Sequence, residues 1–81
     1  MKQLKETEVL VAIGERIANA RLALDMTQAQ FSRASNIQKS SISRIEAGKS
    51  NITMATLFCI AYALEMELEE LFSKHAELVA G

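Results

Sequence analysis

The sequence contains no proline, only three glycines, one cysteine and one histidine in 81 residues. So few turn-forming residues do not fit a many-stranded β fold, but they suit helices joined by short turns. The single cysteine, Cys59, excludes an internal disulfide and a zinc site built from thiolates. The single histidine, His75, excludes a histidine-based metal site or catalytic triad. No apolar run is long enough to span a membrane.

The residues that are present suit one small domain, which we take as residues 1–81. Apolar residues make up 49% of the chain and can supply one core, while 23% charged residues do not indicate disorder. Glu6 and Glu8 lie where a secretory signal would be uncharged, so we expect a cytoplasmic protein.

The net charge of −1 is the sum of segments with opposite charge. Residues 26–51 have a net charge of +3, from Arg33, Lys39, Arg44 and Lys49 against Glu46. Residues 65–81 have a net charge of −4, from five glutamates against Lys74. A basic segment is what a nucleic-acid partner requires, so the distribution is more informative than the sum.

Apolar periodicity and capping residues predict helices over residues 7–24, 28–35, 38–47, 54–64 and 67–80. The first has an apolar stripe at helical spacing, formed by Val9, Ile13, Ile17, Ala20 and Leu24. Three apolar residues of this helix lie off the stripe and are candidates for packing on another helix or on a partner: Leu10, Val11 and Leu22.

Local signals mark the ends of the other helices. Thr27 and Gln30 form a capping box, and Thr53 caps the fourth helix. Asn36 suits a left-handed turn after the second helix, and Gly48 ends the third. The residues expected to face inward are Phe31, Ala34, Ile42, Ile45, Leu57, Ile60, Ala61 and Leu64, with Cys59 as a small core residue.

The stretch from Thr27 to Lys49 is typical of a helix, a short turn and a second helix. The outer face of its second helix is polar, with Gln38, Lys39, Ser40, Ser43 and Arg44. No carboxylate occurs between Asp25 and Glu46, so this face can donate hydrogen bonds without repelling phosphate. In the major groove arginine and lysine read guanine and glutamine reads adenine, which makes these residues candidate base readers.

The segment from Ile13 to Phe72 resembles the Cro/CI-type helix-turn-helix family of phage and bacterial regulators, also called the XRE family. The resemblance is carried by Arg21, Thr27-Gln28, SISRIEAGK from Ser41 to Lys49, and the spacing of Leu57, Ala61 and Leu64. It implies an all-α, compact five-helix bundle of the lambda-repressor-like type, encoded by a bacterium or phage. The family's third helix enters the major groove, and its members usually bind DNA as homodimers. The chain departs from the pattern at Phe31-Ser32, Asn36, Gln38 and Ile52, and Gln38 leaves the start of the third helix open.

The resemblance also implies a role for individual residues. Lys39, Ser40 and Arg44 match the positions that touch base edges, with Gln38 and Ser43 beside them. The residues that match phosphate contacts are Gln28, Lys49, Ser50 and Asn51, and Arg33 is either a further phosphate contact or a solvated side chain. Arg21 and Glu46 match a pair that forms a buried salt bridge in relatives.

An apolar stripe extends toward the end of the chain. Together with His75, its residues are the predicted homodimer interface: Leu71, Phe72, Leu78 and Val79. The alternative is that they complete the core of one copy, as Leu68 and Leu71 are expected to do. The glutamates near residue 67 suit the positive end of a helix dipole, so we do not assign them to a cation.

These observations predict a sequence-specific DNA-binding transcriptional regulator that acts as a homodimer on an inverted-repeat operator. The length and the SNIT segment, Ser50–Thr53, resemble restriction–modification controller proteins, with phage repressors and antitoxins of similar length as alternative subclasses. A second hypothesis is a helical protein-interaction module, such as an antitoxin or adaptor, which the off-stripe residues of the first helix favour. An enzyme is not expected, because the sequence has no nucleophile–base pair, metal-ligand spacing or glycine-rich phosphate loop. No cofactor or small-molecule ligand is expected either.

Overall fold

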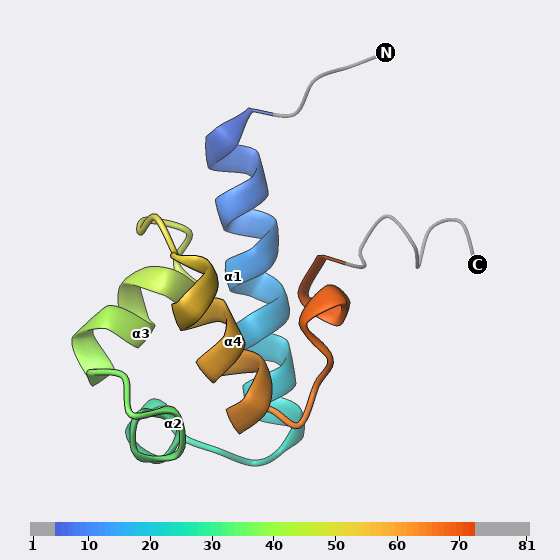
Figure 1. Cartoon of the computed structure of the whole chain (residues 1–81). Helices are drawn as coiled ribbons and strands as arrows, with labels where there is room; N and C mark the ends of the chain where they lie inside the picture. Colours follow the sequence, from blue (N-terminus) through green and yellow to red (C-terminus); the bar gives the residue numbers. More distant parts are fainter. Residues whose placement is uncertain (1–4, 73–81) are drawn as a thin grey trace.

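The computed structural model describes residues 5–72, which form four α-helices and one 3-10 helix (Figure 1). These elements are α1 (Glu6–Ala23), α2 (Gln28–Ser35), α3 (Lys39–Glu46), α4 (Met54–Ala63) and the 3-10 helix η1 (Leu68–Phe72). The predicted all-α fold is confirmed. The bounds of α2 are those predicted, and the ends of α1, α3 and α4 differ from the predictions by one residue at most.

The prediction of a fifth α-helix over residues 67–80 was wrong in the part that the structure describes. A short 3-10 helix, η1, stands there, and residues 73–80 lie outside the described part of the chain. In a 3-10 helix, residues three apart lie on the same side. Leu68 and Leu71 have this spacing, and η1 packs both against the core. The apolar spacing of the segment is therefore compatible with the tighter helix, which packs on α1 and α4.

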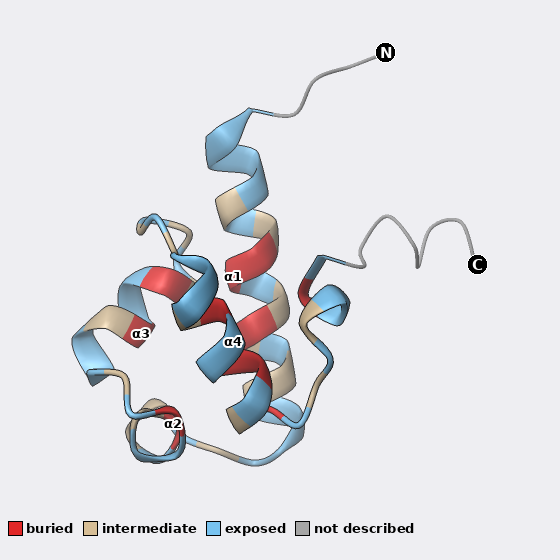
Figure 2. Ribbon diagram, in the orientation of Figure 1, coloured by how far each residue is buried: buried red, intermediate tan, exposed pale blue. Residues whose placement is uncertain are grey.

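Each of the five elements contributes one fully buried large side chain to the core (Figure 2). These side chains are Ile17, Phe31, Ile42, Ile60 and Leu71, in chain order from α1 to η1. Complete burial of a side chain of this size stabilises a fold by about 1.5–3 kcal/mol. The core therefore depends on all five elements, and it holds α3 against both α1 and α2.

Some positions expected in the core are exposed. Ala34 lies on the surface of α2 and Ser35 is buried in its place, where its hydroxyl donates to the Phe31 carbonyl over 2.7 Å. Cys59 is exposed on α4. Val9 and Leu24, at the two ends of the predicted α1 stripe, are 36% and 40% exposed. The first turns of α1 project beyond the other helices in Figure 1.

The turn between α2 and α3 depends on a left-handed residue. Asn36 has φ 60° and ψ 32°, a conformation that costs most residues about 1–2 kcal/mol. We expect Asn36→Ala to lower the free energy of unfolding by about 1 kcal/mol, and Asn36→Gly to lower it less, because glycine adopts this conformation freely. Urea unfolding of the two variants measures the difference. An alanine variant as stable as the glycine variant would contradict the assignment.

Candidate nucleic-acid interface

Side-chain hydrogen bonds fix the start of α2 and the turn that joins α2 to α3. At the start of α2, the Thr27 hydroxyl accepts from the Gln30 amide over 3.1 Å, and the Gln30 side chain accepts from the Thr27 amide over 2.8 Å. At its end, the Ser32 hydroxyl donates to the carbonyl of Ile37, across the Asn36 turn. The predicted capping box is therefore confirmed, and Ser32 adds a bond that the sequence did not indicate.

The two faces of α3 differ in character. Ile42 and Ile45 are 1% and 4% exposed and anchor the helix in the core. The side chains of the predicted base readers are all exposed: Gln38, Lys39, Ser40, Ser43 and Arg44. None of the described residues covers this face, which is the arrangement that contact with nucleotide edges requires.

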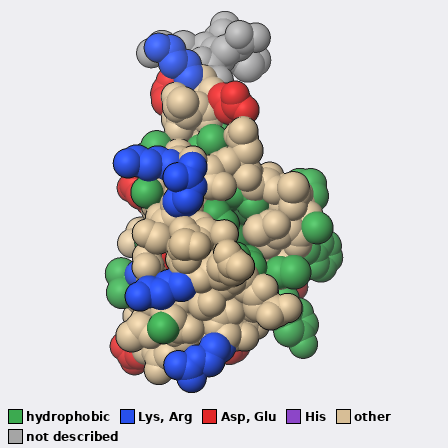
Figure 3. Space-filling view, turned by 90° about the vertical axis from the view of Figure 1, so that its left-hand side faces the viewer, with side chains coloured by type: hydrophobic (Ala, Val, Ile, Leu, Met, Phe, Trp, Pro, Cys, Tyr) green, Lys and Arg blue, Asp and Glu red, His purple; other side chains and the backbone are tan. Residues whose placement is uncertain are grey.

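Positive charge lies on the side of the molecule that carries α3. The basic side chains of residues 26–51 are exposed: Arg33, Lys39, Arg44 and Lys49. Figure 3 looks at this side, and Lys and Arg side chains are spread down its length. The acid of the same segment, Glu46, does not oppose them, because its side chain is 7% exposed and paired. This surface can therefore approach a polyanion closely.

The ion pair between Arg21 and Glu46 is present and is part of a larger network. The Arg21 guanidinium donates from Nε to Glu46 Oε2 over 2.7 Å and from Nη2 to Oε1 over 3.1 Å. Its Nη1 also donates to the Met26 carbonyl over 2.6 Å. Gln28 Nε2 donates to Glu46 Oε1 over 3.0 Å. The network joins the last turn of α1, the start of α2 and the end of α3, so it fixes how α3 is presented.

The loop after α3 places the predicted phosphate contacts beside Arg44. The chain turns at Gly48, with φ 74°, and Arg44 Nη2 donates to the Lys49 carbonyl over 3.2 Å. Lys49 and Asn51 are exposed and Ser50 is half-buried. A predicted base reader and the predicted phosphate contacts therefore lie together at the end of α3.

The residues predicted for a dimer interface are only partly available. Leu71 is 1% exposed and belongs to the core, so its assignment to the interface was wrong and the alternative assignment to the core is confirmed. Phe72 is 47% exposed. His75, Leu78 and Val79 lie outside the described residues.

Two apolar features of the surface differ from the expectations. Val11, off the α1 stripe, packs against the Gly48 turn so closely that a Cβ on Gly48 would lie 2.7 Å from its Cα. The sequence analysis missed a second stripe on α4, where Met54, Phe58 and Tyr62 are exposed. Their spacing of four residues, opposite the inner face of α4, was the signal that could have found it.

Within residues 5–72, no three His, Cys, Asp or Glu side chains are grouped so that they could hold a metal ion. No helix in the same range has the length and apolar character needed to cross a membrane.

Comparisons with known proteins agree with this geometry. Residues 17–71 match the family HTH_3, described as helix-turn-helix. The cryptic phage CTXphi transcriptional repressor RstR of Vibrio cholerae serotype O1 is 41% identical over 64 residues, which cover 79% of this chain. The match covers 57% of RstR, so this chain spans little more than half of that relative's length.

Two solved structures of restriction-modification controller proteins are also similar. C.AhdI from Aeromonas hydrophila is 30% identical, with a TM-score of 0.76 over 78% of this chain and 96% of that one. A point mutant of C.Esp1396I is 26% identical, with a TM-score of 0.78 over 99% of this chain and 96% of that one. The similarity to these two proteins extends over nearly all of their length.

Proposed function

This chain belongs to the helix-turn-helix family HTH_3, a family of DNA-binding regulators and not of enzymes, and from that premise we propose that it is a sequence-specific transcriptional regulator. The observation that carries the proposal is the outer face of α3, which is exposed, free of carboxylates and fixed by buried isoleucines on its inner side. It acts as a homodimer on an inverted repeat, with the two α3 helices about 34 Å apart, one turn of B-DNA.

Each polar residue of the interface has a proposed role. Lys39, Ser40 and Arg44 contact base edges, with Gln38 and Ser43 beside them. The proposed phosphate contacts are Gln28, Arg33, Lys49, Ser50 and Asn51. The bond from Gln28 to Glu46 supports its second role, which is to brace α3 against the start of α2.

Regulation follows from occupancy of the operator. A protein bound across a promoter excludes polymerase, and one bound beside it can recruit polymerase. The similarity to RstR, a phage repressor, favours a repressor that excludes polymerase from a promoter. The similarity to C.AhdI and C.Esp1396I supports the alternative, a controller of restriction and modification.

Selection of bound duplexes from a random pool tests the proposal. We expect enrichment of an inverted repeat and an affinity for duplex that falls steeply as the salt concentration rises, because bound phosphates release counterions. A pool without enrichment would contradict the proposal. Strong binding to a protein that salt does not weaken would instead favour the alternative, a protein-interaction module.

The variant Arg44→Ala separates base reading from general attraction. We expect it to weaken specific binding by about 1–3 kcal/mol and to relax the preference at one base position. Its bond to Lys49 is exposed, so the fold should not depend on it. Arg33→Ala, which removes an exposed arginine from α2, serves as the control and should weaken binding equally for all sequences. An unchanged preference after Arg44→Ala would remove this residue from the base-reading set.

A further inference from the structure

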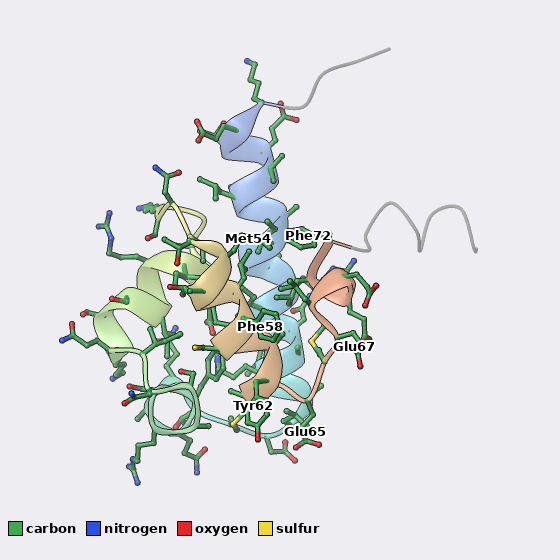
Figure 4. All side chains as sticks on the ribbon, viewed as in Figure 1. Met54, Phe58, Tyr62, Glu65, Glu67 and Phe72 are labelled. Atoms are coloured by element: carbon green, nitrogen blue, oxygen red, sulfur yellow. The ribbon has the colours of Figure 1, made fainter. Side chains whose placement is uncertain are left out.

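The outer face of α4 carries three large apolar side chains. Met54, Phe58 and Tyr62 are 60%, 64% and 84% exposed. They follow one another at intervals of four residues, so they form one stripe along the helix, and Figure 4 shows them in line on it. The exposed face of a helix that only covers a core is normally polar. A contiguous apolar stripe therefore indicates a surface that another molecule covers.

The core of one copy does not explain this stripe. The inner face of α4 is formed by other residues, which are buried: Leu57, Ile60 and Ala61. The outer stripe is a ridge with an open groove on each side. One groove, of about 290 Å³, separates it from η1 and is lined by Phe58, Tyr62, Met66 and Leu68 among others. The other, of about 260 Å³, faces α2 and includes Ala34 and Cys59.

A ridge flanked by grooves on one helix is complementary to a copy of itself, because helices pack with ridges in grooves. We propose that a second copy of this chain covers the stripe, with the two α4 helices packed antiparallel about a twofold axis at Phe58. In that register Met54 of each copy lies against Tyr62 of the other. The inference rests on the proposed function, since it names the interface of the homodimer.

The exposed apolar area of the stripe is more than half of what one partner of a dimer buries. Met54, Phe58 and Tyr62 together expose on the order of 450 Å², given their exposed fractions and the size of such side chains. A standard interface buries about 800 Å² per partner. The stripe therefore supplies the larger part of the area of a standard interface, and the two grooves beside it give further residues that a partner can contact.

Charge favours the antiparallel arrangement. The first turn of α4 carries no acid and is the positive end of the helix dipole. Acids follow the other end, where Glu65 and Glu67 lie just beyond Tyr62 in Figure 4. An antiparallel pair brings the acidic end of each α4 toward the positive end of its partner, whereas a parallel pair would place the acidic ends together.

The arrangement also leaves both DNA-binding faces free. The side that carries α3 faces left in Figure 1 and faces the viewer in Figure 3, while α4 lies at the front in Figure 1. The hydrophobic side chains along the right-hand edge in Figure 3 lie on that front side. The apolar face is therefore turned by roughly a right angle from the basic face. A twofold axis that lies in the interface and points toward the basic side keeps both α3 helices on the same side of the dimer.

Sedimentation equilibrium of the full chain tests the proposal. The wild-type chain should dimerise, and Phe58→Glu, which places two carboxylates together at the axis, should raise the dimer dissociation constant by roughly 30-fold or more. Leu22→Glu removes a side chain of α1 that is 58% exposed, and it should leave dimerisation unchanged. Circular dichroism should show native helix content in both variants. A wild-type chain that stays monomeric at high concentration, or a folded Phe58→Glu that dimerises normally, would overturn the proposal.

A charge pair tests the register. Met54→Lys and Tyr62→Glu should each weaken the dimer, and the double variant should recover affinity, because each lysine then meets a glutamate of the other copy. A double variant weaker than both single variants would overturn the antiparallel register. Duplex selection keeps the two proposals separate. A chain that dimerises through α4 but selects no duplex refutes the DNA-binding proposal alone, and one that selects duplexes as a monomer refutes this interface alone.

Discussion

Gly14→Ala is expected to lower the free energy of unfolding by about 3 kcal/mol, although alanine is the better helix former. Helix propensity alone predicts a gain of about 1 kcal/mol in α1. A Cβ at Gly14, however, would lie 2.4 Å from the carbonyl oxygen of Ile45 and 2.8 Å from that of Glu46. Both atoms belong to the backbone of α3, so no side-chain rotation can relieve the clash. The two helices must move apart, which makes the cost exceed the gain.

Thermal unfolding measures this effect, and the melting temperature should fall by roughly 10 °C or more for a domain of this size. Asn19 is an exposed residue of α1, and the variants Asn19→Gly and Asn19→Ala serve as the control pair. These two variants also differ by a change from glycine to alanine, but at an exposed position where no other helix lies close. The alanine variant should therefore be the more stable by about 1 kcal/mol. A Gly14→Ala variant more stable than wild type would show that α1 and α3 do not approach closely at this position. Duplex binding should weaken as well, since Glu46 at the end of α3 moves with the displaced backbone.

Local signals in the sequence were enough to place α2 and α3. The Thr27 capping box and Asn36 act through atoms a few residues away, so their effect does not depend on the rest of the fold. The last element could not be predicted in the same way. The spacing of Leu68 and Leu71 fits an α-helix and a 3-10 helix alike, and the contacts of η1 with α1 and α4 decide between them. Gly14 was not singled out either, because a glycine does not indicate which helix approaches it.

The exposed face of α3 was predicted more fully than the apolar surface of α4. Only one face of α3 is apolar, the face with Ile42 and Ile45. The helix can therefore be oriented in only one way, with the isoleucines inward. On α4 apolar residues occur on both sides, so the sequence pattern is compatible with two orientations of the helix. The stripe through Leu57 and Ala61 accounted for the core, and Phe58 then remained without an assignment. The exposed fractions of the side chains show which of two apolar faces of a helix lies in the core, and the periodicity of the sequence alone does not.

Glu46→Ala is expected to lower the free energy of unfolding by about 3–5 kcal/mol. The Arg21 side chain is 11% exposed, so removal of the carboxylate leaves a guanidinium with little access to water and only the Met26 carbonyl as a partner. Gln28 also loses its acceptor. Urea unfolding measures the loss. Glu46→Gln is the matched control and should cost less, because its side-chain oxygen can still accept one of these bonds.

The double variant Arg21→Met, Glu46→Leu tests whether the buried ion pair makes a net contribution to the stability of the fold. Replacement of a buried ion pair by apolar residues of similar size is often neutral or favourable, since two charges no longer leave water. We therefore expect the double variant to be within about 1 kcal/mol of wild type and far more stable than Glu46→Ala. Its duplex affinity should still fall, because Gln28 no longer has a bond to the end of α3 and the orientation of the proposed base-reading face is less well fixed. A double variant that is stable and binds duplex as well as wild type would show that the network neither stabilises the domain nor positions α3.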